Sequence, residues 1–289
     1  MRFKAKNREV LIFILSSILC PLSSLWSAFD VNYMFGARAF GMAGAYTACG
    51  DVDSILWNPA GLSQVSSFEA SFMYLNPFGI EGLSQGYFSL AKKFSKMTFA
   101  FGGSQFLWEN YYREEVKIFA FALSGNSVSA GLCLKFMEYN VDDISPDYSF
   151  SDRVGIDTGL KIPLGINSSF GISVANLNKP GILKISKINP RAGFSFYVRD
   201  NFLLCLDLWS QNQKNSYAFG MEYEVVPGIF FRAGLNKISL NFGCGLSFKK
   251  FRFDWAFQKF DEIFYDNHRF SIVMKFLLNT KTNGCQMNG

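Results

Sequence analysis

Few side chains in this sequence have the types and spacing that catalysis requires. The single histidine, His268, has no nucleophile elbow to accompany it, so a Ser-His-Asp triad has no support. Gly41-Met-Ala-Gly44 and Gly243-Cys-Gly245 lack the βαβ surroundings of a dinucleotide fingerprint. Asp142-Asp143 fits a solvated loop better than a cation site. We therefore expect neither enzymatic activity nor a bound cofactor.

The six cysteines are too far apart to form a recognisable metal site. None forms a CxxC pair, the spacing typical of structural zinc sites. Five of them follow residue 28, an odd number that cannot pair completely within one chain. Those that stand within apolar runs are interpreted as small hydrophobic residues, namely Cys133, Cys205 and Cys244. The sequence therefore predicts no metal ligand.

The charged residues are more informative, because they recur on one side of alternating runs. Asp254, for example, stands between Phe253 and Trp255. The charged side is also rich in Gly, Ala and Ser, as the interior row of a narrow β-barrel must be. The charged residues expected to face this interior are Asp157, Asp207, Glu222, Glu224, Arg232, Arg252 and Asp254. Two interpretations stay open: a functional charged network, or side chains that only solvate and brace the lumen.

The alternating pattern continues from about residue 67 to residue 278. It comprises about fourteen runs, each close to the ~9–11 residues that a tilted membrane strand requires. Phe is abundant, with 33 copies, and only 18% of residues are charged, against about 25% in soluble domains. We predict an all-β fold, an antiparallel up-and-down transmembrane β-barrel of about 14 strands over residues 67–278. A soluble antiparallel sandwich shows the same alternation and is the main alternative.

The N-terminus has the composition of an export signal. Four basic residues and one acidic residue come first, and an almost uniformly apolar run follows from Val10 to Leu19. A spanning helix needs ~20 apolar residues, so we assign residues 1–28 to a signal peptide rather than an anchor, and expect the bacterial outer membrane as the location. Without residues 1–28 the net charge falls from +5 to +2, which indicates no nucleic-acid partner. Residues 279–289 are predicted to be a polar C-terminal tail.

Residues 29–66 do not follow the strand pattern. Their first part is too rich in Gly and Ala for a lipid-facing strand, and their second part favours a short helix or turn that ends at Asn58-Pro59. We predict a compact hatch, or plug, inside the lumen, built on Gly36, Arg38, Gly41, Gly44, Tyr46, Trp57, Asn58, Pro59 and Gly61. The Asn58 side chain is expected to hydrogen-bond the segment's own backbone. The alternative is that this segment is the first strand and a periplasmic turn.

The same segment resembles the PorV/PorQ-like branch of the FadL-type outer-membrane β-barrel proteins. The resemblance runs over G-x-R-x-x-G-M-x-G-A-Y-x-A from Gly36 to Ala48, and over W-N-P-A-G-L from Trp57 to Leu62. Weaker similarity covers nearly all of the remaining chain. The resemblance implies a fourteen-stranded barrel with an N-terminal hatch, embedded in outer-membrane lipid.

Two functions follow from this resemblance. FadL-type barrels imply uptake of a hydrophobic or amphipathic small molecule past a movable hatch, and this is the predicted function. PorV-like proteins imply instead a scaffold or shuttle at the outer membrane, whose partners are the proteins of a secretion system. An apolar pocket that opens to the side of the lumen would favour transport over the scaffold.

Overall fold

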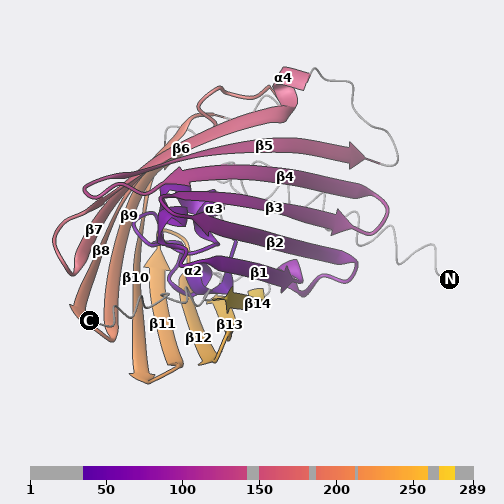
Figure 1. The fold of residues 1–289 in the computed structure, drawn as a ribbon. Helices are drawn as coiled ribbons and strands as arrows, with labels where there is room; N and C mark the ends of the chain where they lie inside the picture. Colours follow the sequence, from indigo (N-terminus) through magenta and orange to yellow (C-terminus); the bar gives the residue numbers. More distant parts are fainter. Residues whose placement is uncertain (1–34, 142–149, 182–186, 212–213, 260–266, 277–289) are drawn as a thin grey trace, which may run out of the picture.

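The computed structural model describes residues 35–141, 150–181, 187–211, 214–259 and 267–276. Within these ranges the chain forms fourteen antiparallel strands that close into a barrel around short helical segments (Figure 1). The expected signal peptide (residues 1–28), Asp142-Asp143 and the expected polar tail (residues 279–289) lie outside the described residues. No described helix is long and apolar enough to cross a bilayer.

Each strand pairs with its neighbours in sequence, and β1 also pairs with β14. The strands are β1 (Phe68–Leu75), β2 (Leu83–Phe94), β3 (Met97–Trp108), β4 (Tyr112–Leu123), β5 (Ser129–Val141), β6 (Val154–Pro163), β7 (Ser168–Ala175), β8 (Asn189–Arg199), β9 (Phe202–Gln211), β10 (Lys214–Val226), β11 (Ile229–Asn236), β12 (Leu240–Phe248), β13 (Phe251–Lys259) and β14 (Asn267–Phe276). The up-and-down topology is the predicted one. Closure through β1 and β14 leaves no free sheet edge, so the sandwich alternative is wrong.

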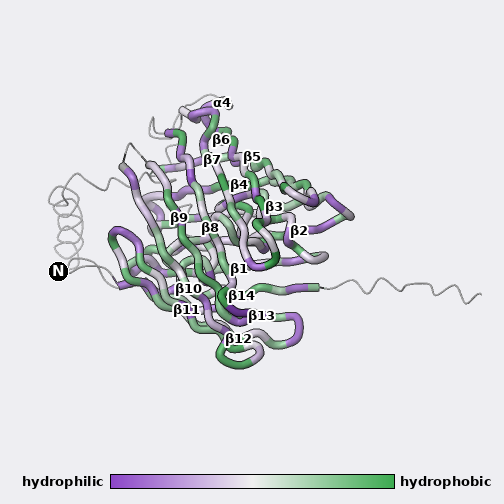
Figure 2. The backbone as a smooth tube through the Cα atoms, turned by 90° about the vertical axis from the view of Figure 1, so that its left-hand side faces the viewer, coloured by the Kyte–Doolittle hydropathy of each residue, from purple (hydrophilic) through white to green (hydrophobic). Residues whose placement is uncertain are grey.

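Side-chain burial alternates along the strands, as the sequence predicted. In β13, Phe253 is exposed on the outside, whereas Arg252 and Asp254 are buried towards the lumen. Outward rings meet across strands, as in the Phe101–Phe119 pair with centroids 5.0 Å apart. In Figure 2 hydrophobic residues run along the strands, and hydrophilic residues gather at several turns. An outer surface of this kind is the one that lipid solvates.

Charged residues also occur on the outer face, near one end of β4 and β5. Arg113 pairs with Glu115 there, and Lys117 lies 4.0 Å from Glu138 on the neighbouring strand. Charges that point into hydrocarbon are costly, so the apolar band ends at this level of the barrel. The ends of β4 and β5 therefore extend beyond the lipid-facing surface.

The segment before β1 forms α2 (Ala37–Gly41), α3 (Ser54–Trp57) and the 3₁₀ helix η2 (Pro59–Gln64), whereas η3 (Pro77–Gly79) and α4 (Phe150–Arg153) adjoin strand ends. α3 stops at Trp57 because Asn58, which precedes a proline, adopts the extended backbone with φ −156° and ψ 104°. This segment, residues 35–67, packs inside the barrel and is called the plug below (Figure 1). The predicted interior location is confirmed, and the alternative of a first strand with a turn is wrong.

Candidate functional site

The first half of the plug rests on the C-terminal strands. The Ala37 amide donates to Ser271 Oγ at 3.3 Å, and Asn241 Nδ2 donates to the Phe40 carbonyl at 2.7 Å. The Arg269 guanidinium lies 3.6 Å from the centre of the Phe40 ring. At the end of α2, Gly41 lies against Gly243 of β12. Two facing residues without Cβ allow the helix to lie directly on the wall.

Two plug glycines have backbone conformations that other residues rarely adopt. Gly36 has φ +83°, and a Cβ there would lie 2.6 Å from a carboxylate oxygen of Asp53. Gly44 has φ +81° and lies against the ring of Trp57, whose Nε1 donates to the Phe35 carbonyl at 2.9 Å. The Gly-rich sequence is therefore used for tight turns that bring the two halves of the plug together.

A cluster of charged side chains joins the plug to the wall, and we call it the plug–wall network. Its members are Arg38, Tyr46 and Asp51 from the plug, and Glu222, Arg232, Arg252 and Asp254 from β10, β11 and β13. Arg38 donates two hydrogen bonds to Glu222, at 2.8 and 2.6 Å, and one to Asp51 at 3.2 Å. Such a bidentate arginine–carboxylate pair fixes orientation as well as charge.

The wall side of the network is equally well connected. Arg232 pairs with Glu222 at 2.6 Å and with Asp254 at 2.8 Å, and Arg252 pairs with Asp254 at 2.7 Å. Arg252 also reaches plug residue Asp51, at 3.4 Å. Three arginines thus balance three carboxylates, which is the condition for burying charges at tolerable cost.

The two plug acids near this network have opposite pKa shifts. Burial would raise the pKa of Asp51, but the positive charges of Arg38 and Arg252 outweigh burial and lower it to about 2. Asp53 is also buried, and burial together with the negative charge of Asp51 raises its pKa to about 7. The plug therefore contains one carboxylate that is strongly held in its charged form and one that titrates near neutrality.

A second contact holds the plug on β9, through Asp207. One carboxylate oxygen of Asp207 accepts from the Tyr46 amide at 3.1 Å, and from the Thr47 amide and hydroxyl at 3.0 and 2.6 Å. Arg191 of β8 pairs with the same oxygen at 3.0 Å and donates to the Gly44 carbonyl at 2.7 Å. Its guanidinium also lies near the rings of Trp57 and Trp209, at 4.9 and 4.4 Å from their centres.

The third contact is made by Asn58 and the residues after it. Asn58 Oδ1 accepts from the Ala60 amide at 3.1 Å, and its Nδ2 donates to the Thr47 carbonyl at 2.8 Å, so it bonds the plug's own backbone. Nδ2 also donates to the Leu160 carbonyl of β6 at 3.0 Å. Pro59 lies against Gly131 of β5, and Gly61 packs on Ser54 within the plug.

Besides Asp207, two of the predicted lumen charges are not members of the network, although Glu224 lines the same cavity as Glu222 and Arg232. Asp157 on β6 pairs with Lys135 of β5 at 2.9 Å, on another part of the wall. Glu224 lies near the end of β10 and accepts from the Gly228 amide at 2.7 Å. Arg191 was not predicted from the sequence. It is buried between more exposed neighbours on β8, the same alternation that identified the other lumen-facing charges. Asp51 and Asp53 were missed because no alternation marks the plug.

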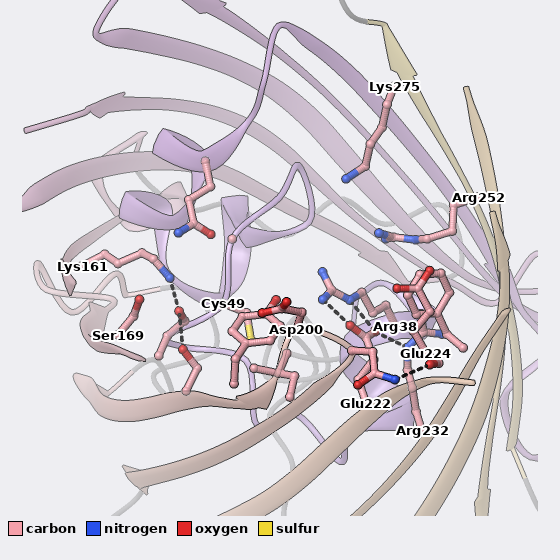
Figure 3. A pocket seen from close by; sticks show the side chains of 18 residues that line it. Arg38, Cys49, Lys161, Ser169, Asp200, Glu222, Glu224, Arg232, Arg252 and Lys275 are labelled. Atoms are coloured by element: carbon pink, nitrogen blue, oxygen red, sulfur yellow. Dashed lines mark hydrogen bonds and ion pairs between the residues drawn. The ribbon is translucent and has the colours of Figure 1, made fainter. Parts of the chain in front are cut away.

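A polar cavity of about 340 Å³ lies between the plug and the wall (Figure 3). Its charged lining consists of the basic residues Arg38, Lys161, Arg232, Arg252 and Lys275 and the acidic residues Asp200, Glu222 and Glu224. Figure 3 shows Arg38, Glu222 and Arg232 grouped on one side of the cavity, with Lys161 across from them. A lining of charged side chains is suited to polar or charged groups, not to bare hydrocarbon. Among the described residues, no three His, Cys, Asp or Glu side chains are grouped as metal ligands.

An apolar hollow of about 470 Å³ lies on the wall formed by the first five strands. Its lining includes the outward-facing rings of Phe99, Phe101 and Phe119, with Ala100 and Ala120 between them. Small residues on the lumen side and rings on the lipid side make this part of the wall thin and apolar. The hollow is formed by the lipid-facing surface, so it is separate from the polar cavity at the plug.

These features define a closed fourteen-stranded β-barrel with an N-terminal plug in its lumen. The fold is similar to that of solved hydrocarbon channels and of a FadL homologue. The crystal structure of the P. putida toluene transporter TodX matches with a TM-score of 0.55 and 11% identity, over 84% of this chain and 98% of that one. A deltaS2 mutant of the TodX monoaromatic hydrocarbon channel matches with a TM-score of 0.58 and 10% identity, over 86% and 100%. A Pseudomonas aeruginosa FadL homologue matches with a TM-score of 0.58 and 9% identity, over 82% and 97%.

At 9 to 11% identity, these similarities concern the fold. No protein-family model matches the sequence, and no curated protein matches it either. The predicted FadL-type architecture is thus confirmed as a fold, whereas the PorV/PorQ branch stays a prediction.

Proposed function

We propose that this protein is an outer-membrane channel that takes up hydrophobic or amphipathic small molecules through a barrel gated by its plug. The observation that carries the proposal is the way in which the plug is held. It lies in the lumen and adds no strand to the sheet. Its contacts with the wall combine ion pairs and hydrogen bonds with buried apolar packing. Because the sheet closes without the plug and the polar contacts can be exchanged for water, the plug can shift while the sheet stays closed.

The substrate class is supported by the fold and by the outer surface. Two of the similar structures are a toluene transporter and a monoaromatic hydrocarbon channel. The apolar hollow beside Phe99 and Phe101 gives a lipid-dissolved molecule a place to collect against the barrel wall. An amphipathic molecule would then present its polar end to the charged and polar lining of the cavity.

The alternative is a PorV-like scaffold or shuttle that works with secretion-system proteins. One observation favours it, namely the charged lining of the cavity at the plug. A purely apolar solute would have to desolvate these groups without replacing their hydrogen bonds. In this alternative the plug is a permanent filling of the barrel, and a partner protein binds to the surface.

Uptake into proteoliposomes distinguishes the two functions. The mature chain, recovered from outer membranes, is reconstituted and supplied with a fluorescent monoaromatic probe or with a charged dye of similar size. We expect the apolar probe to enter faster than in empty liposomes, and Arg38→Gln, which loosens the plug, to accelerate its entry. Lys117→Gln on the outer face is the matched control and should match the wild type, since Lys117 is exposed.

Two results would contradict transport. Recovery of the mature chain as a soluble periplasmic monomer would exclude the membrane location. Probe entry no faster than in empty liposomes, for both the wild type and Arg38→Gln, would remove gating and favour the scaffold.

A further inference from the structure

Two cysteines that are far apart in sequence meet at the boundary between plug and wall. Cys49 follows the Tyr46–Thr47 turn of the plug, and Cys205 lies on the lumen side of β9. Their Sγ atoms are 3.4 Å apart, although 156 positions separate them in the chain. Both are buried and free. The interpretation of Cys205 as merely a small hydrophobic residue is therefore incomplete.

The surrounding contacts hold these two sulphur atoms together. Asp207, two residues after Cys205 on the same face of β9, binds the amides of Tyr46 and Thr47. On the other side, the Ala48 carbonyl accepts from Lys161 Nζ and from Ser195 Oγ. A turn bonded to three strands has little freedom, so the effective concentration of one thiol at the other is high.

We propose that Cys49 and Cys205 are a redox modification site, at which disulfide formation covalently ties the plug to β9. A disulfide bond is about 2.05 Å long, so the two sulphur atoms need to approach by only about 1.4 Å to form one. Oxidation would fix the Tyr46–Cys49 turn and leave the other plug contacts as they are. The oxidising setting of the cell envelope rests on the proposed location, whereas the pairing itself rests on geometry.

The reaction needs a two-electron oxidant, and we assign a low-molecular-weight disulfide to this role. Cys49 lines the polar cavity, so its thiolate attacks the oxidant from the lumen and releases one thiol, which leaves a mixed disulfide. Cys205 lies behind Cys49, and its thiolate then displaces the second thiol from the Cys49 sulphur. The protein loses two hydrogens, and the oxidant is reduced to two thiols.

The test uses the reduced full-length mature protein in detergent and 2,2′-dithiodipyridine, whose thiol product absorbs light. We expect Cys49 and Cys205 both to lose their free thiols, a tryptic peptide pair linked through Cys49 and Cys205, and separation of this pair by reductant. Cys205→Ala should stop at a stable mixed disulfide on Cys49. Cys133→Ala, which removes another buried lumen-side thiol, should still give the linked pair.

Two results would overturn the proposal. One is a wild-type protein that carries separate mixed disulfides on Cys49 and on Cys205. The other is a protein in which both thiols stay free while the more exposed Cys244 reacts. Neither result depends on whether the barrel transports a solute, so the failure of this proposal is separable from a failure of the proposed function.

Discussion

At the residue scale, Arg38 joins the plug to the wall and the two halves of the plug to each other. It pairs with Glu222 on β10 and with Asp51 in the second half of the plug. We predict that Arg38→Gln lowers the free energy of local opening of residues 36–62 by about 3 kcal/mol, because it leaves buried carboxylates short of a positive charge. Native-state hydrogen exchange in detergent measures this quantity.

The control for Arg38 is a lysine with a much weaker ion pair. Lys117 is exposed and lies 4.0 Å from Glu138, so Lys117→Gln should change the same free energy by less than about 0.5 kcal/mol. Arg38→Lys should restore part of the loss, since it returns the charge without the bidentate geometry. Equal effects of the two Gln substitutions would show that the plug does not depend on Arg38.

Asp53 makes the stability of the plug depend on pH. Its pKa is about 7 in the folded protein, against an ordinary value of 3.8. The folded state therefore binds the proton more tightly, and stability falls as pH rises from about 4 to about 7, by up to about 4 kcal/mol. Asp51, with a folded pKa of about 2, contributes in the opposite sense and only in acid, where its stabilisation is lost as pH falls below about 4.

The variant Asp53→Asn tests this dependence, since it keeps the shape and cannot ionise. We expect its plug to be more stable than that of the wild type at pH 8 and similar at pH 4. Hydrogen exchange of the plug, corrected for the intrinsic rate at each pH, gives both values. A wild-type plug whose opening free energy is constant between pH 4 and pH 7 would contradict the shifted pKa of Asp53.

At the element scale, the faces of β13 separate lipid from lumen. Phe253 is exposed on the outside, so we predict that Phe253→Arg destabilises the barrel by ~2–4 kcal/mol at mid-membrane depth. Phe253→Leu keeps an apolar side chain and should cost much less. Urea unfolding in lipid vesicles compares the two, and equal costs would mean that Phe253 does not face lipid. An arginine at Ala256, on the lumen side of the same strand, would not be a neutral control, because Ala256 packs against Ala37 and Phe40 of the plug.

The elements were predictable from the sequence to different degrees. Alternation placed Arg252 and Asp254 on the lumen side, and the Gly-rich composition placed Gly36 and Gly44 in the interior. Both are local properties, which a sequence contains directly. The ion-pair partner of each charged side chain could not be predicted, because it depends on strand register around the closed barrel. Arg38 meets Glu222 across 184 positions, whereas Asp157, predicted in the same row, pairs with Lys135 elsewhere.

At the scale of the whole molecule, the sheet and the plug have separate roles in stability. The barrel closes through the β1–β14 pairing, to which the plug contributes no strand. The plug in turn supplies partners for wall charges such as Glu222 and Asp207. Without the plug these groups would face water in the lumen, which costs far less than leaving them buried and unpaired.

The separate roles lead to a prediction for deletion of residues 36–62. The truncated chain should still assemble into a barrel that migrates differently on gels before and after heating, because β1 to β14 and their pairings are intact. Its permeability to small solutes in liposomes should rise, because the deletion removes the segment that fills the lumen. Loss of assembly would show that the plug is needed for folding. An assembled barrel that admits no additional solute would show that the lumen is closed by something other than the plug, and would leave the scaffold function as the better explanation.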